Sequence, residues 1–239
     1  MTNTMPNKAK VMIGMVAVAS LCPVALGAAN WQTPTWSQLA LLMIAAALTS
    51  QLRVKLPGLT STMSGNLPVI LLGITQLGLL GGLMVAVTAA VAQSAASGKL
   101  KPVQFLFNTC TLMNATALAY AVYHSRFLTA SVGSMGTLAM AAAVYFLTNT
   151  APVAAIISLT EDKNAMAIWH KAFLWSFPNY VVGAGLAAFA SQFTTVGLVS
   201  LAAVVAVLFG VYRSYKMFVS LVEQSEQPKT MSMSMAAGR

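Results

Sequence analysis

The chain is a series of long apolar stretches separated by short polar connections. A helix needs about 20 mainly apolar residues to cross the roughly 30 Å of hydrocarbon in a bilayer. By this criterion the sequence predicts apolar segments at about residues 11–29, 37–52, 67–80, 83–96, 103–124, 128–160, 173–193 and 195–212. We therefore expect an all-α protein, a polytopic transmembrane helix bundle of about eight spans.

Two of these stretches carry an internal interruption. The apolar run from Leu67 to Ser97 is too long for one comfortable span and is interrupted at Gly81-Gly82, so we expect a hairpin of two short helices. At about 1.5 Å per residue neither half crosses a whole bilayer, and the hairpin is expected to be thin, tilted or partly re-entrant. In the segment at 128–160, Pro152 removes a backbone donor and disfavours helix in the residue before it. This predicts a break or kink at Thr148–Pro152.

Composition places these segments in lipid. Hydrophobic residues make up 58% of the chain and charged residues only 7%, whereas a soluble domain is about one quarter charged. The 13 basic and 4 acidic residues give a net charge of +9, but the basic residues occur in ones and twos and form no patch. Such scatter suits contacts with anionic lipid headgroups rather than a nucleic-acid surface. We therefore expect the lipid bilayer as a partner, and no nucleic acid.

Charge also predicts the orientation, because cytoplasmic loops collect Lys and Arg. A cytoplasmic N-terminus places all basic residues inside except Arg126. The inside set is Lys8, Lys10, Arg53, Lys55, Lys99, Lys101, Lys163, Lys171, Arg213, Lys216, Lys229 and Arg239. A single span at 67–97 would flip everything after it and place most of the basic residues outside, so the hairpin is favoured. We expect a cytoplasmic N-terminus at 1–10, a transmembrane bundle at 11–215, and a cytoplasmic tail at 216–239 that is disordered.

The first apolar segment has an alternative interpretation as a cleaved signal peptide. A basic start, an apolar core and the small residues Gly27–Ala29 are all present. Its length favours a retained span, and Pro23 is tolerated in a packed membrane helix. Cys22 is not expected to be lipidated, because Leu21 before it is too bulky for such a site. Cys22 and Cys110 are expected to be small buried hydrophobes.

Titratable groups are scarce in the predicted spans. The acidic residues all fall in predicted cytoplasmic loops or the tail, at Glu161, Asp162, Glu223 and Glu226. His124 and His170 are predicted at opposite faces of the membrane, too far apart to share a metal. Paired carboxylates, a nucleophile elbow and a phosphate-binding loop are absent from the sequence. We therefore expect no enzymatic activity, no metal site and no cofactor.

Several amide side chains nevertheless lie inside the predicted spans. The candidate ligand-binding residues are Asn108, Asn149, Asn114, Asn179 and Gln76. One interpretation is that they hydrogen-bond across helices, worth roughly 0.6 to 2 kcal/mol each, and this interpretation is favoured. The other is that some line a pocket for a small uncharged or weakly polar ligand. Asn108 and Asn149, on long segments expected to face each other, are the best candidates for such a pocket.

Four stretches carry a resemblance to a known class of protein. They are Arg53-Val-Lys-Leu-Pro-Gly58 followed by Ser64, the pair Phe107-Asn108, Tyr145-Phe-Leu-Thr-Asn-Thr150, and Trp169 through Phe173-Leu-Trp-Ser-Phe-Pro-Asn-Tyr180 with Gly183. Together they resemble the multipass N-terminal membrane modules that precede HD-GYP phosphodiesterase or GGDEF diguanylate cyclase domains in bacterial signalling proteins. The similarity covers about residues 10–215.

The resemblance implies a sensor in the bacterial cytoplasmic (inner) membrane that passes a signal from a small ligand or a membrane cue into a cytoplasmic output domain. This chain has neither a G-G-D-E-F stretch nor an HD motif after Tyr212. Signalling would therefore need a separate cytoplasmic signalling protein. Two alternatives stay open, a substrate-binding membrane subunit of a vitamin-type uptake transporter, which the bundle also resembles, and a membrane scaffold that binds no ligand.

Overall fold

The computed structural model describes residues 5–31, 33–55, 62–96, 102–170, 177–191, 202–210, 212–213 and 217. The helices are α1 (Asn7–Ala29), α2 (Trp36–Thr49), α3 (Leu67–Ala95), α4 (Pro102–Tyr123), α5 (Arg126–Glu161), α6 (Ala165–Ile168) and α7 (Phe177–Ala190). Residues 202–210 are also helical. The predicted all-α helical bundle is confirmed. The predicted tail at 216–239 lies outside the described residues, except for Met217.

The sequence analysis did not predict a short strand pair, nor did it predict the short helix α6. Strands β1 (Arg53–Lys55) and β2 (Thr62–Ser64) pair antiparallel, with Val54 opposite Met63. The pair occupies the polar connection between α2 and α3. It therefore leaves the helical class of the fold unchanged.

Four of the described helices are long and apolar enough to cross a membrane, namely α1, α3, α4 and α5. Two shorter apolar helices accompany them, at Trp36–Thr49 and Tyr180–Ala190. Lipid accepts helices because each one satisfies its own backbone hydrogen bonds. The chain is therefore a multi-pass helical membrane protein.

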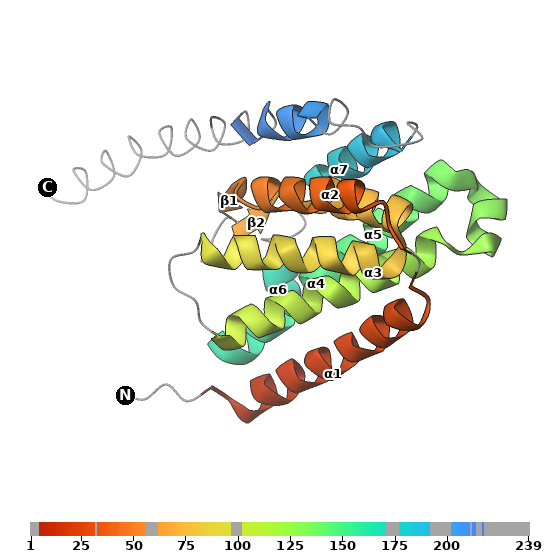
Figure 1. The fold of residues 1–239 in the computed structure, drawn as a ribbon. Helices are drawn as coiled ribbons and strands as arrows, with labels where there is room; N and C mark the ends of the chain where they lie inside the picture. The colour runs from red at the N-terminus through yellow and green to blue at the C-terminus, as the bar shows by residue number, and fades with distance from the viewer. Residues whose placement is uncertain are drawn as a thin grey trace, which may run out of the picture.

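The helices lie side by side, and their connections fall at two opposite ends of the bundle (Figure 1). We call the end with the start of α1 and the β1–β2 pair the inner end. The opposite end, where α1 joins α2 and α4 joins α5, is the outer end (Figure 1). The names follow the predicted membrane sides, and the orientation and the number of spans stay predictions.

Helix α3 is a hairpin that turns at Gly78. Gly78 has φ 72° and ψ −171°, a non-helical conformation inside the element. A Cβ on Gly73 would lie 3.3 Å from the Cα of Gly82, whereas nine residues of continuous helix would separate them by roughly 13 Å. The predicted hairpin is therefore confirmed, but its turn is at Gly78 and not at Gly81-Gly82. The reason is conformational, because a positive φ at this point is readily adopted only by glycine.

Helix α5 also breaks at a glycine, and not where proline predicted. The non-helical residue inside α5 is Gly133, with φ 73° and ψ 172°, while Pro152 lies within continuous helix. The expected break at Thr148–Pro152 is therefore wrong, and the alternative of a kink there stays a prediction. Membrane helices tolerate proline where neighbouring groups satisfy the backbone. The hydroxyl of Thr148 donates to the Val144 carbonyl oxygen at 2.7 Å, so this polar side chain is satisfied within the helix.

The core is built around the first half of the α3 hairpin. Every residue from Leu67 to Ile74 is buried, which is the pattern of a helix surrounded by others. Helices α2 and α4 pack on the hairpin, and α5 packs on α4. Helix α1 lies at the edge, and Cys22 on it is exposed, whereas Cys110 on α4 is buried. The expectation of a buried Cys22 is wrong, because α1 presents much of its surface outward.

Candidate functional site

Three of the five predicted ligand-binding residues join pairs of helices. Asn114 Nδ2 donates to the Val16 carbonyl oxygen at 3.0 Å and ties α4 to α1. Asn149 Nδ2 donates to the Tyr180 hydroxyl at 3.2 Å and ties α5 to α7. Gln76 Oε1 accepts from Gln38 Nε2 and ties α3 to α2. Each bond satisfies a polar group within the bundle, as expected of amides in membrane helices.

Asn108, the fourth candidate, is exposed on α4, and the side chain of Asn179 lies outside the described part of the chain. Neither of the two described cavities is lined by any of the four candidates whose side chains the structure describes. Asn149 comes nearest, because its partner Tyr180 lines one of them. The structure therefore does not gather these four residues into one site, and ligand binding by the five stays a prediction.

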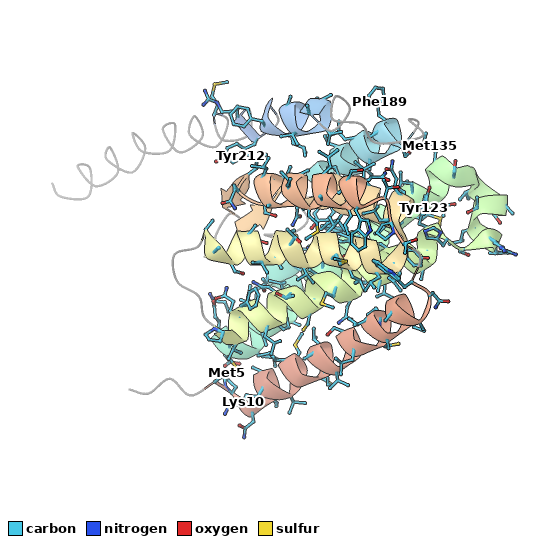
Figure 2. The ribbon with its side chains drawn as sticks, in the orientation of Figure 1. Met5, Lys10, Tyr123, Met135, Phe189 and Tyr212 are labelled. Carbon is cyan, nitrogen blue, oxygen red and sulfur yellow. The ribbon has the colours of Figure 1, made fainter. Side chains whose placement is uncertain are left out.

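An open cavity of about 520 Å³, lined mainly by residues with polar side chains, lies at the outer end of the bundle. We call it the outer pocket. Its lining comes from the end of α4 and from both sides of the α5 break, and consists of Tyr123, His124, Arg126, Thr129, Ala130 and Ser134. Figure 2 shows Tyr123 at this end, with Met135 beyond it on the returning part of α5. The pocket therefore exists because α5 leaves the bundle and turns back at Gly133.

His124 is held in the outer pocket by three neighbours. Its Nε2 lies 3.3 Å from the Ile74 carbonyl oxygen. Since a carbonyl only accepts, Nε2 is the donor of this bond. The rings of Tyr120 and Tyr123 flank the imidazole, with centroids 4.1 Å and 5.1 Å away. His124 therefore links the pocket to the carboxyl end of the first half of α3, close to the Gly78 turn.

The charge of the outer pocket comes from Arg126. This arginine is exposed, and its guanidinium offers five donors in a fixed fork. Its position is fixed by a capped start of α5, where Ser125 Oγ accepts from the Leu128 amide at 3.4 Å and Thr129 Oγ1 donates to the Ser125 carbonyl oxygen at 3.1 Å. The described residues that line the pocket include no carboxylate. The pocket therefore offers a permanent positive charge and several donors.

The sequence analysis used Arg126 only as a marker of topology. Its isolation was nevertheless a signal, because it is the one basic residue predicted outside, next to a histidine in the sequence His124-Ser125-Arg126. What the sequence did not indicate is the break at Gly133. That break returns Ser134 to the same cavity.

A second cavity is apolar and lies between α5 and α7. Its volume is about 320 Å³. It is lined mainly by small and aliphatic side chains, Met135, Leu138, Ala139, Ala142, Ala143, Val181, Ala184, Gly185 and Ala188, together with Phe177 and Tyr180. Phe146 packs against two of these rings, with centroids 5.5 Å and 4.8 Å away. We call this cavity the α5–α7 groove. Its small side chains leave the two helices loosely interlocked along it.

The two histidines lie at opposite ends of the bundle (Figure 1). His124 is at the outer end, and His170 directly follows α6, which comes after the inner end of α5. Among the described residues, the His, Cys, Asp and Glu side chains form no group of three that could hold a metal ion. Comparison with known proteins gives no match to any family model, curated protein or solved structure. The class that the fold defines is thus a multi-pass helical membrane protein.

Proposed function

We propose that this protein is a sensor-type membrane module of the bacterial cytoplasmic membrane. Its outer pocket binds a small ligand, and its inner end passes the signal to a separate cytoplasmic protein. The module carries out no chemistry of its own. The observation that supports this most is a single helix joining the two ends. Helix α5 runs without a further break from Ser134, in the pocket, to Glu161, a length of about 40 Å.

A continuous helix transmits a displacement along its axis because its turns are hydrogen-bonded, although Pro152 cannot donate one of these bonds in α5. Small shifts of packed helices are a common form of switching. The α5–α7 groove favours such a shift, since alanine and glycine side chains interlock less than branched ones do. In the described part of this interface, the bond from Asn149 to Tyr180 is a polar restraint. A movement of α5 that starts in the outer pocket would therefore strain that bond and reach the inner end.

The inner end of α5 presents a charged turn to its surroundings. Glu161 and Lys163 form an exposed ion pair of 2.5 Å, with side chains 42% and 59% exposed. Asp162 between them adopts a left-handed conformation that ends the helix, and Asn164 caps α6 by accepting from the Ala167 amide at 3.0 Å. An exposed turn of this kind, at the end of the connecting helix, suits contact with a cytoplasmic partner. The resemblance to membrane modules of signalling proteins supports the same direction.

The test is capture of the partner from native lipid. The tagged full-length protein is extracted in native-lipid particles after crosslinking, and bound proteins are identified by mass spectrometry. We expect a cyclic-dinucleotide cyclase or phosphodiesterase, and its loss in the charge-swapped variant Glu161→Lys/Lys163→Glu. A matched control, Lys8→Glu/Lys10→Glu, changes charge at the start of α1 and should leave capture intact. Recovery of a transport ATPase with no signalling enzyme would contradict the proposal and favour an uptake subunit.

A further inference from the structure

We propose that the outer pocket is an anion site that binds the carboxylate or phosphate group of a small molecule. This inference rests on the proposed function in one respect, because it takes the outer pocket as the ligand-binding site. The sequence analysis expected an uncharged ligand bound near the asparagines. The outer pocket instead carries a charge, and the described asparagine side chains do not line it. The juxtaposition that defines the site is Arg126 with His124, Thr129 and Ser134 around one cavity.

Each of the polar side chains that line the pocket can donate a hydrogen bond, and Arg126 can only donate. A guanidinium donates and never accepts, and it pairs with a carboxylate or phosphate in a two-bond fork. The hydroxyls of Ser134 and Tyr123 can donate to further oxygens of the same anion. Thr129 Oγ1 and the Nε2 atom of His124 already donate to backbone carbonyl oxygens, and these bonds hold the two side chains in position. A cation would meet Arg126 without any carboxylate to offset the repulsion.

Arg126 has no acidic partner among the residues that the structure describes. Among the residues that the structure describes, the ion pair is the one between Glu161 and Lys163. These two residues are at the far end of α5, roughly 40 Å along the helix from Ser134 in the same pocket, and charges separated by more than about 8 Å are screened at physiological ionic strength. The positive charge at the outer end is therefore uncompensated by the described part of the chain. A bound anion would supply the missing charge.

The size of the pocket and its rim define the possible sources of the anion. A volume of about 520 Å³ falls in the range of small-molecule sites, roughly 300 to 1,000 Å³. Phe127, beside Arg126, is 78% exposed, and Val132 and Met135 are about half exposed. Exposed apolar side chains of this kind would insert into the interfacial region of the membrane. The anionic group could thus belong to a dissolved solute or to a lipid headgroup, and the experiment separates the two.

The first arm tests dissolved anions. Full-length protein in phosphatidylcholine nanodiscs is titrated calorimetrically with potassium phosphate, sodium succinate and, as a neutral control, succinamide. We expect saturable binding of at least one anion, no binding of succinamide, and a weakening of about tenfold or more in Arg126→Gln. Arg126→Lys keeps the charge but loses the fork, and should retain part of the affinity. Arg213→Gln removes the same charge from another exposed arginine and should change nothing.

The second arm tests lipid. Nanodiscs containing phosphatidylglycerol are used, and native mass spectrometry counts the phosphatidylglycerol molecules that stay bound after the disc is removed. Retention by the wild type and Arg213→Gln, but not by Arg126→Gln, would support the site and identify a headgroup as its ligand. Absence of binding in both arms, or an equal loss in Arg126→Gln and Arg213→Gln, would overturn the proposal. Neither arm needs the cytoplasmic partner, so failed partner capture with intact anion binding would refute only the signalling function.

Discussion

The turn of the α3 hairpin can be tested by the sign of a stability change. In a continuous helix, replacing an interior glycine by alanine stabilises by roughly 0.5 to 1 kcal/mol. At Gly78 the φ of 72° and ψ of −171° lie in a region that is essentially restricted to glycine, where another residue costs about 1 to 3 kcal/mol. The hairpin therefore predicts that Gly78→Ala destabilises, whereas a single straight span predicts that it stabilises.

A neighbouring glycine tests the same turn through sterics. A Cβ on Gly81 would lie 2.3 Å from the Cβ of Leu77, a separation that forces the backbone to move. Overpacking of this kind typically costs about 1 to 3 kcal/mol, so Gly81→Ala should also destabilise. Gly14 on α1 is the matched control, because a Cβ there meets nothing within 4 Å. Gly14→Ala should be neutral or slightly stabilising.

The assay is reversible unfolding of the purified protein by dodecyl sulfate in mixed micelles, followed by tryptophan fluorescence. The free energies of unfolding of the three variants are compared with the wild type under one set of conditions. We expect Gly78→Ala and Gly81→Ala each to lower the free energy of unfolding by about 1 to 3 kcal/mol. If both variants matched Gly14→Ala in sign and size, α3 would be a continuous helix, and the predicted sides of every later segment would reverse.

The remaining predictions concern the helix contacts and the topology. Asn149→Ala and Tyr180→Phe should each lower the free energy of unfolding by roughly 0.6 to 1.7 kcal/mol. The double variant should lose less than the sum, since both substitutions remove the same bond. Additive losses would contradict a shared bond. Asn108→Ala should change the free energy of unfolding by less than about 0.5 kcal/mol, because the side chain is exposed, and a larger loss in the same titration would contradict that position. A reporter that is active only in the cytoplasm should be active when it is fused after Arg239. The cysteine introduced by Arg126→Cys should react with an impermeant thiol reagent added outside the cell. The opposite pattern would reverse the assigned orientation.

Local features of the sequence were enough to predict the class of the fold. The length and apolar content of each segment are properties of neighbouring residues, and lipid demands that such segments be helical. The hairpin at Leu67–Ser97 also followed from the sequence, because the distribution of Lys and Arg constrains the number of crossings. Its turn was misplaced by three residues. Gly78, Gly81 and Gly82 are equivalent in composition, and the helix packing decides which of them adopts a positive φ.

The break in α5 shows a second limit of local reasoning. Proline is the stronger local signal for a break, so Thr148–Pro152 was predicted and Gly133 was not. In the structure Pro152 is carried in continuous helix, while the chain turns at Gly133. A proline in a membrane helix can be accommodated by its neighbours. The outcome therefore depends on packing that the sequence does not display.

The sequence by itself determined that this is a helical membrane protein, which stretches are apolar, and which polar residues lie within them. The tertiary structure decided which residues meet, including the bond of Asn114 to Val16, the bond of Asn149 to Tyr180, and the outer pocket around Arg126. The physical reason is that a membrane helix is apolar on the faces that meet lipid and on those that meet other helices alike. Hydrophobic periodicity therefore cannot mark the packed face, and the contacts arise only when distant segments come together.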